Sequence, residues 1–593
     1  MLVASLLLQQ FARAAESPPL RSLDPPVLLP GGGEFLTWES SKPPQFSRTY
    51  YVDGTATNAS DENPGTQLRP FKTINHAAQI LRPGQRVLVA AGVYRERVAP
   101  ARGGTGPDRM ITYQAEPDAK VIIKGSRVIA PAWQPSTAEP VNAPQVVWMT
   151  KLNPSWFADG YDPFAVDNLT AAQFKKMPWA QPQQDNPVFH LPRGLVFQNG
   201  RRLRQVILPD ELLAQAGTYW VDRINQTLHV RPFGDVAPDS AKWEITTRET
   251  VFAPRRENLG YIRVQGFTLE QVAGPWPFSQ LGALSTMRGH HWIIEDNTIR
   301  QVNGAGMDIG RQKLEDYARV YGHHIVRRNH ISDCGIVGIC GFGPGDGKVS
   351  FGLLVEDNFI ERCGWQDAEN LHECGGIKLH CNNHCLVRRN LIVDTLHGPG
   401  IWMDAYNGYT RVCQNIILHS RGRGALFFEI SFKPNLVDRN FIWDSSTFGI
   451  LEADGNGQTF ANNFIGDCHE GIELRGRQTD RVKAEDCGHH EVFNNVIVGC
   501  ARPILERYNQ SRIPSLLEGN VTNGVTARFD AEALRLAWRA MEPPPSTHPV
   551  NCITHDFFGR SVDAQHLVPG PFASWPRETN SVVFKRPESQ YWQ

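Results

Sequence analysis

The most regular feature of the chain is an isoleucine that follows an asparagine by two positions and recurs eight times. The asparagines are Asn297, Asn329, Asn358, Asn390, Asn415, Asn440, Asn463 and Asn495. Their separations are 32, 29, 32, 25, 25, 23 and 32 residues. A period in the twenties with one apolar residue at the same point of each repeat is too short for a pair of helices and fits a coil of short strands. The pattern predicts an all-β fold, a parallel β-helix solenoid.

A column of small side chains accompanies the repeat, five residues after each asparagine. Its members are Val302, Cys334, Cys363, Thr395, Ser420, Ser445, Cys468 and Cys500. Stacked rungs place equivalent positions above one another, so the column needs residues of one size, and cysteine serves as a small hydrophobe. The asparagines are interpreted in the same way, as a hydrogen-bonded ladder at a tight turn. All 11 cysteines lie between Cys334 and Cys552, and their odd number argues against a dense disulfide framework.

The segments outside the repeat differ in pattern. Residues 48–129 resemble the beginning of the same coil, and apolar residues at helical spacing over 70–79 predict a helix that caps its open end. Over residues 130–250 the repeat disappears, and the alternation at 217–231 predicts an inserted antiparallel β-sandwich domain.

The main coil then extends over residues 251–523. The tail at residues 524–593 is expected to hold one helix, over 530–541, followed by proline-rich irregular chain.

The N-terminal segment and the charge balance limit the cellular context. Residues 1–15 combine an apolar run with a small-residue stretch, which predicts a secretory signal peptide and a secreted or periplasmic protein. No other stretch approaches the length of about 18 apolar residues that a membrane span needs. With 60 basic and 61 acidic side chains, no basic surface is left over for a nucleic acid or an anionic membrane.

The shortest rungs, between Asn390 and Asn463, are expected to expose their strand faces in a groove flanked by loops. Three glycine- or alanine-led strands lie in or beside this region, and side-chain alternation predicts one shared outer face. The residues of that face are Lys378, His380, Trp402, Asp404, Phe427 and Glu429.

Two carboxylates on this face are the sharpest chemical signal. Asp404 and Glu429 each stand 11 residues before a repeat asparagine, so they occupy the same position on successive rungs. Neighbouring strands are separated by about 4.8 Å, which suits the carboxyl pair of a retaining glycosidase. Among phenylalanines, Glu429 is predicted to be the acid/base and Asp404, beside Lys378 and His380, the ionised nucleophile.

Other interpretations of the stacked acids stay open. They are also compatible with solvated ladder positions or a cation site. Glu452 likewise stands 11 residues before Asn463. Paired with Asp404 across two rungs, at about 9.6 Å, it would suit an inverting hydrolase.

The segment from His372 to Cys385 contains several potential metal ligands but no paired C-x-x-C knuckle, and strand alternation separates its side chains. We therefore expect no metal and no cofactor, and interpret Cys374, Cys381 and Cys385 as packing residues. Trp402, beside the carboxylates, and Trp276 are candidates for stacking on a sugar.

Three of these motifs resemble family 120 of the glycoside hydrolases, the β-xylosidases. They are His372-Glu-x-x-Gly-Ile-Lys-Leu-His380, Gly400-Ile-Trp-Met-Asp404 and Phe428-Glu429-Ile-Ser431. The resemblance implies a right-handed parallel β-helix interrupted by a small immunoglobulin-like sandwich. It also implies an exo-acting, retaining β-xylosidase that acts on short xylo-oligosaccharides and assembles into homo-oligomers.

In that family's terms Asp404 is the nucleophile and Glu429 the acid/base. His372 and Glu373 would hold the terminal sugar, with Lys378 and His380 nearby. The sequence departs from the family after Asp404, where it reads Ala405-Tyr-Asn-Gly-Tyr409, and in its cysteine-rich 374–385 segment.

Two further functions are alternatives. A polysaccharide lyase on the same kind of coil would need a lysine or arginine base, for which Lys378 is the candidate, and usually Ca²⁺. A solenoid that binds glycans without cleaving them is the other, because a fold does not fix a function.

Overall fold

The structure is a computed structural model, and its description covers most of the chain. The residues described are 20–138, 146–157, 159–175, 185–276, 281–310, 322–343, 352–366, 368, 373–508 and 513–592. The predicted signal peptide at residues 1–15 and the predicted sugar ligand His372 lie outside them.

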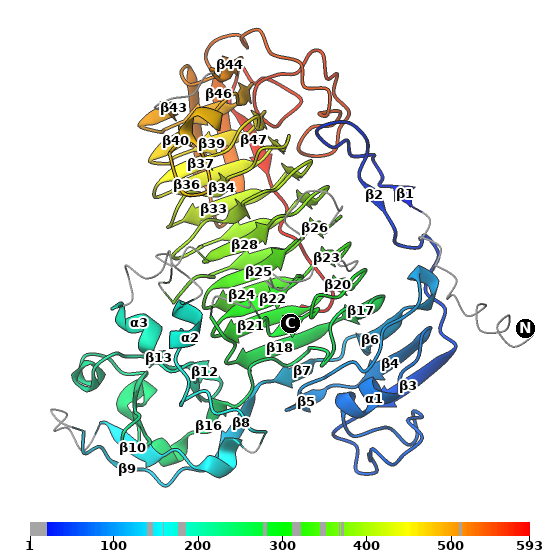
Figure 1. Cartoon of the computed structure of the whole chain (residues 1–593), viewed down its shortest axis with the longest axis vertical. Coiled ribbons are helices and arrows are strands. Elements are labelled where there is room, and N and C mark those ends of the chain that lie inside the picture. Colours follow the sequence, from blue (N-terminus) through cyan, green and yellow to red (C-terminus); the bar gives the residue numbers. More distant parts are fainter. Residues whose placement is uncertain are drawn as a thin grey trace, which may run out of the picture.

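Three parallel sheets run along a single coil and form its walls (Figure 1). Each strand pairs with the equivalent strand of the next rung, so the predicted parallel β-helix is confirmed. The 13-stranded sheet contains β3 (Arg48–Val52), β4 (Gln85–Val89), β6 (Ile111–Ala115), β17 (Ile262–Gln265), β20 (Ile293–Glu295), β23 (Ile325–Arg327), β26 (Leu354–Glu356), β29 (Leu386–Arg388), β32 (Arg411–Cys413), β35 (Leu436–Asp438), β38 (Thr459–Ala461), β41 (Glu491–Phe493) and β44 (Leu516–Glu518).

The other two walls have the same stacked arrangement. The 11-stranded sheet contains β5 (Gly92–Tyr94), β7 (Val121–Lys124), β18 (Phe267–Val272), β21 (Thr298–Val302), β24 (His330–Cys334), β27 (Phe359–Glu361), β30 (Leu391–Val393), β33 (Ile416–Ser420), β36 (Phe441–Ser445), β39 (Phe464–Gly466) and β42 (Val496–Val498). The nine-stranded sheet contains β19 (Leu284–Ser285), β22 (Ala305–Asp308), β25 (Val337–Phe342), β28 (Gly375–His380), β31 (Ile401–Asp404), β34 (Leu426–Glu429), β37 (Phe448–Ala453), β40 (Glu470–Gly476) and β43 (Arg502–Tyr508).

The repeat asparagines form the predicted ladder at the turn between the first two sheets. Asn415, for example, donates from Nδ2 to Asn440 Oδ1 and to the carbonyl of Val387, at 3.0 and 3.1 Å. The ladder has one more member than the isoleucine repeat, because Asn520 accepts from Asn495. The side-chain amides of the ladder are thereby hydrogen-bonded, which matters because an unpaired buried amide is costly.

The interior of the coil is one continuous apolar core. The isoleucine of each repeat lies in it, from Ile299 to Ile497, with at most 2% of its surface exposed. The small-residue column also stacks as predicted: Val302 pairs with Cys334, and Ser420 pairs with Ser445. All 11 cysteines are free thiols, and nine are buried, which agrees with a packing role.

The N-terminal end of the coil is covered by the predicted helix, α1 (Ile74–Ile80). Thr73 caps it by accepting a hydrogen bond from the backbone N–H of His76, at 3.2 Å. Ile74, Ala77 and Ala78 point into the core, so the helix closes the open end of the solenoid.

Within the described residues, no helix has the length and apolarity needed to cross a bilayer.

An inserted unit lies between β7 and β17 and projects from the lower part of the coil (Figure 1). It consists of two sheets whose strands are mostly antiparallel and whose inner faces share one apolar core. The strands are β8 (Ser126–Ile129), β9 (Gln134–Pro135), β10 (Trp148–Lys151), β11 (Val196–Gln198), β12 (Arg201–Arg202), β13 (Arg204–Gln205), β14 (Thr218–Asp222), β15 (Thr227–Arg231) and β16 (Trp243–Thr246), with short helices α2 (Ala171–Phe174) and α3 (Pro187–His190). This is the β-sandwich that the sequence predicts.

The helix predicted over residues 530–541 is wrong. The segment belongs to a three-stranded antiparallel sheet of β45 (Val525–Asp530), β46 (Arg535–Ala540) and β47 (Asn580–Val583). Burial alternates along β46, where Leu536, Trp538 and Ala540 are buried. Residues with good helix propensity therefore form a strand, because period-two burial against the 11-stranded wall outweighs intrinsic preference.

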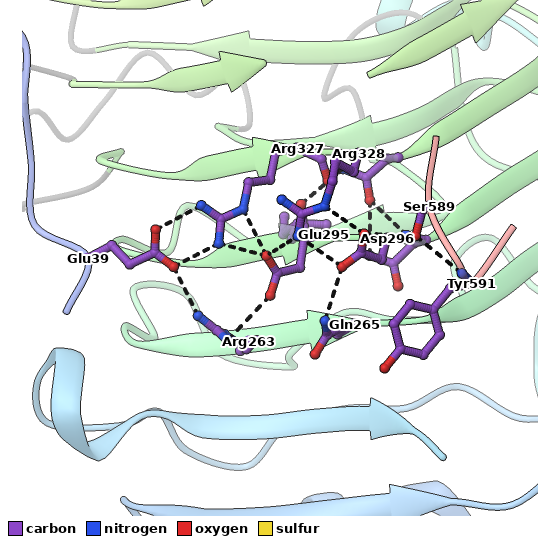
Figure 2. A network of polar contacts seen from close by, with 12 residues as sticks. Glu39, Arg263, Gln265, Glu295, Asp296, Arg327, Arg328, Ser589 and Tyr591 are labelled. Atoms are coloured by element: carbon purple, nitrogen blue, oxygen red, sulfur yellow. Dashed lines mark hydrogen bonds and ion pairs between the residues drawn. The ribbon is translucent and has the colours of Figure 1, made fainter. Parts of the chain in front are cut away.

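One polar network, on the 13-stranded wall and at the turn that follows β20, holds both terminal segments (Figure 2). Glu39, from the N-terminal segment, accepts hydrogen bonds from Arg327 at 2.7 and 2.8 Å. At the other end of the network Ser589, from the C-terminal segment, donates to Asp296 at 2.8 Å. Two residues link these ends: Arg328 pairs with both Glu295 and Asp296, and Glu295 pairs with Arg327.

Candidate active site

The outer face of the nine-stranded sheet brings the predicted site residues together. Strand register places Lys378 beside Trp402, and His380 beside Asp404. The following pair of strands is in register at Met403 and Phe428, so the next residues along them are Asp404 and Glu429. Their backbones are one strand spacing apart, about 4.8 Å. Two acids that are distant in the sequence are thus adjacent on one wall.

Three side chains surround Asp404 on the side away from Glu429. Lys378 Nζ lies 3.0 Å from Asp404 Oδ2 and 2.9 Å from Glu373 Oε2. His380 Nδ1 lies 3.2 Å from Asp404 Oδ2, and its Nε2 lies 3.7 Å from Glu373 Oε2. All four residues are buried, and Lys378 is completely inaccessible. The result is a compact charged cluster at the floor of the face.

This cluster keeps Asp404 ionised. Burial opposes its ionisation, but His380 and Lys378, with a contribution from Arg481, outweigh burial and lower the pKa of Asp404 to about 2. The pKa of Glu373 is also lowered, because Lys378 and His380 together outweigh its burial. The pKa of Lys378 is raised, since the two carboxylates offset the cost of burying its charge. Lys378 therefore acts as a fixed cation.

Glu429 has the opposite shift. Burial and the adjacent negative charge of Asp404 raise the pKa of Glu429 to about 7, although Lys378, Arg481 and Arg423 act against this rise. Two neighbouring carboxyls therefore differ in protonation near neutral pH. One is an anion and the other can donate a proton, which is the division of roles that acid-assisted glycoside cleavage uses.

The two predicted sugar-stacking tryptophans do not offer an open face. Trp402 is 1% exposed, stacks on Phe427 with ring centroids 5.1 Å apart and lies under Lys378 Nζ at 3.6 Å. Trp276 is fully buried in an apolar cluster and donates from its indole N–H to the carbonyl of Asn303. The prediction that these residues stack on a sugar is therefore wrong, because both are packing residues. Trp402 lies beneath Lys378 and so supports the charged cluster.

Glu452 does not share the column of Asp404 and Glu429. Strand register pairs Glu429 with Ala453, and Glu452 with the inward-facing Phe428. Glu452 is fully buried, with its Oε2 2.9 Å from His490 Nε2. The turn after β37 has one residue fewer than the turn after β34, and a shift of one residue moves a strand side chain to the other face. The predicted pairing of Glu452 with Asp404 is therefore wrong.

One charged residue near the acid pair, Arg481, was not predicted from the sequence. The segment 477–487, which follows β40, packs Val482 against Ala405 and Ile430, the residues immediately after Asp404 and Glu429. Arg481 is consequently close enough for its charge to act on both carboxyls. Because this segment lies outside the repeat, the spacing of the repeat could not predict its path.

In the part of the chain that the structure describes, no three His, Cys, Asp or Glu residues are grouped to hold a metal ion.

Comparisons with known proteins agree with the parallel β-helix fold. A family model described as "Right handed beta helix region" matches residues 282–465. The chain folds as a right-handed parallel β-helix. The structure of XylC in complex with xylose matches with a TM-score of 0.68 and 21% identity, covering 90% of this chain and 100% of XylC.

Other similarities are shorter or weaker. The PL6 family alginate lyase AlyGC matches with a TM-score of 0.42 and 13% identity, over 89% of this chain and 59% of the lyase. Among curated proteins, the uncharacterized protein YwoF of Bacillus subtilis (strain 168) is 34% identical over 71 residues, which is 12% of this chain and 15% of YwoF.

Proposed function

We propose that this protein is a retaining exo-glycosidase that releases xylose from the ends of xylo-oligosaccharides. The observation that carries the proposal is the position of two carboxyls on neighbouring strands in surroundings that lower the pKa of Asp404 to about 2 and raise the pKa of Glu429 to about 7. The similarity to XylC, which was solved with xylose, supports xylose as the glycone. The motif resemblance at His380, Asp404 and Glu429 supports the same glycone.

The reaction has two displacements at one carbon. In the first, Asp404 attacks the anomeric carbon, the glycosidic bond breaks, and the proton of Glu429 passes to the departing oxygen. In the second, Glu429 removes a proton from water, the water oxygen attacks the anomeric carbon, and the bond to Asp404 breaks. The product has the same anomeric configuration as the substrate, and both carboxyls return to their starting protonation.

The buried cluster beside Asp404 suits the recognition of a sugar. Glu373 Oε2 is within 3.7 Å of His380 Nε2 and bonded to Lys378, so its position is fixed. A fixed carboxylate next to the nucleophile can accept hydrogen bonds from sugar hydroxyls, and Lys378 limits the repulsion between the two anions. His372 is part of the proposal through the family resemblance alone.

The lyase alternative has less support. It requires a lysine or arginine that can accept a proton, and Lys378 is inaccessible to solvent and held between two carboxylates that raise its pKa. Such a lysine stays protonated and is unsuited to abstract a proton. Unsaturated products that absorb in the ultraviolet would favour a lyase over a hydrolase.

The deciding experiment is hydrolysis of an aryl β-xyloside followed by NMR, with β-xylose expected as the first product. Asp404→Ala is expected to lower kcat by about 10⁴-fold or more. A 2-deoxy-2-fluoro xyloside should label Asp404, as seen by peptide mass spectrometry. Release of α-xylose first, or full activity of the variant, would contradict the proposal. Binding without hydrolysis across a panel of glycosides would favour a glycan-binding solenoid.

The expected homo-oligomer and the expected export through a signal peptide are also proposals. Light scattering of the purified protein and fractionation of expressing cells test them.

A further inference from the structure

One cavity of the molecule lies on a different wall from the acid pair. The 13-stranded sheet lines it at β29 and β32, whereas Asp404 and Glu429 belong to the nine-stranded sheet. The N-terminal residues Pro25–Val27 and parts of the C-terminal stretches 554–559 and 583–587 also line it. Its volume is about 520 Å³, which falls in the range of roughly 300–1,000 Å³ that small-molecule sites occupy.

Four arginines from the coil form the floor of this cavity. Two carboxylates are each shared by two of these arginines, and Asp357 is the one acid among the described lining residues. Three carboxylates thus face four guanidinium groups, so the floor keeps an excess of positive charge. The shared pairs are Arg388 and Arg389 on Glu356, and Arg411 and Arg439 on Asp438, at 2.7–2.8 Å.

Two further cations, Lys585 and Arg586, reach the cavity from the segment that follows β47. Both side chains are exposed, and neither forms an ion pair with an acid in the described part of the chain. The Arg586 guanidinium lies 4.9 Å from the centre of the Phe359 ring, which keeps it beside the wall. The positive charge of the cavity is therefore largest where the side chains are free to meet a ligand.

The remaining lining is largely apolar and partly open. Phe558 is 44% exposed and stacks on Phe572, with ring centroids 5.9 Å apart, so its ring is held in place. Val583 is 52% exposed, and Phe557 and Ile416 extend the same apolar lining. Exposed apolar side chains in one cavity with unpaired cations suit a ligand that has an apolar part and a negative charge.

We propose that this cavity binds an organic anion, a ring that carries a carboxylate or a phosphate group. The ring packs against Phe558 and Val583, and the oxyanion pairs with Lys585 and Arg586 over the arginine floor. Guanidinium and ammonium groups form charge-assisted hydrogen bonds with both kinds of oxyanion. The inference stands apart from the proposed function, because none of its residues belongs to the acid pair or to the cluster beside Asp404.

The test measures the affinity of the full chain for three probes by saturation-transfer NMR: 1-naphthoate, 1-naphthyl phosphate and the uncharged 1-naphthamide. At low salt at least one anion is expected to bind about tenfold more tightly than the amide, which has the same ring. The tighter anion identifies the preferred oxyanion. In about 0.5 M NaCl this advantage should fall to about twofold, since exposed charges are screened.

Variants locate the binding. The double variant Lys585→Gln and Arg586→Gln should raise the Kd of the preferred anion about tenfold and leave the amide unchanged, because only charge is removed. Phe558→Ser should weaken the anion and the amide alike, by about fivefold. The matched control is Lys72→Gln with Arg82→Gln, two exposed cations at the N-terminal end of the coil, which should keep the wild-type affinities.

Three results would overturn the inference. They are no binding of either anion at millimolar concentration, equal affinity of the wild-type protein for the anions and the amide, and an anion affinity that the Lys585 and Arg586 changes leave intact. Both of these side chains are exposed, so their variant tests the inference even if Phe558→Ser fails to fold.

Discussion

The Lys378 ammonium lies 3.0 Å from Asp404 Oδ2 and is completely shielded from solvent. A buried cation at this distance stabilises the ionised form of the nucleophile without being available for proton transfer. The ion pair therefore sets the lower end of the pH range in which the proposed enzyme works.

Replacing Lys378 by methionine is expected to raise the pKa of Asp404 from about 2, because a major opposing charge is lost while burial persists. The acidic limb of the kcat/KM profile should move to higher pH, and kcat should fall by about 10–100-fold. Steady-state kinetics from pH 3 to pH 9 measure both effects. The exposed Lys72→Met variant is the control, and an unmoved acidic limb in Lys378→Met would contradict the assignment.

The alkaline limb should report Glu429. Its pKa is raised to about 7 by burial and by Asp404, so activity should decline above that pH as the acid loses its proton. In Glu429→Gln the alkaline limb should disappear for an aryl xyloside with a good leaving group, and kcat for a poor leaving group should fall by about 10²–10⁴-fold. A persistent limb near pH 7 in this variant would assign the proton to another residue.

Glu429 also makes a stability prediction with a definite sign. An acid with a raised pKa in the folded protein stabilises the fold below its unfolded pKa and loses that contribution as pH rises through the folded value. Glu429→Gln cannot ionise, so it should be more stable than wild type at pH 8, by an amount on the order of 1 kcal/mol, and nearly equal at pH 4. Thermal unfolding at the two pH values measures the difference, and a variant that is less stable at pH 8 would contradict the raised pKa.

The asparagine ladder should contribute to stability at each rung. Asn440 donates to Asn463 Oδ1 and to the carbonyl of Val412, both at 3.0 Å, and accepts from Asn415. Asn440→Ala leaves several buried groups unpaired and should cost about 2–4 kcal/mol in the free energy of unfolding. Urea denaturation measures this cost. Asn523→Ala, at an exposed asparagine, should change stability by less than about 0.5 kcal/mol.

The N-terminal segment should detach when Glu39 loses its charge. The pKa of Glu39 is lowered, because hydrogen bonding and charge from Arg327, with Arg263 and Arg21, outweigh its burial. An acid with a lowered pKa stabilises above its unfolded value and loses this contribution as pH falls. Glu39→Gln should raise amide exchange over residues 20–47 by about tenfold at neutral pH. Glu62→Gln, an exposed acid, serves as control, and equal exchange in both variants would show that other contacts hold the segment.

The sequence predicts the coil well because each rung imposes the same requirements on equivalent residues. Ile417 and Asn415 meet the same neighbours as Ile442 and Asn440, so their identities repeat and can be recognised. The same counting aligns Asp404 with Glu429, since the turns that follow them have equal length. Counting back from the asparagine fails at Glu452, because the following turn is one residue shorter and the Glu452 side chain lies on the opposite face of its strand.

Features outside the repeat are less accessible to sequence reasoning. Trp276 and Trp402 are of a residue type that often stacks on sugars, and only the packing in the structure shows that both are buried. Strand register places Arg475 two strands beyond Glu429 on the same outer face, and counting along the strands could have found this position. Arg481 could not, because Val482 docks its segment through contacts that no periodicity encodes.

The stacking of rungs turns the separation of outward groups into a whole number of steps of about 4.8 Å. Splicing one additional 25-residue turn between the two acids would double their spacing while leaving every reacting side chain unchanged. At about 9.6 Å a water molecule fits between the carboxyls, and the favoured product would be the opposite anomer. In such a scaffold, the number of turns between the two acids decides which anomer is released.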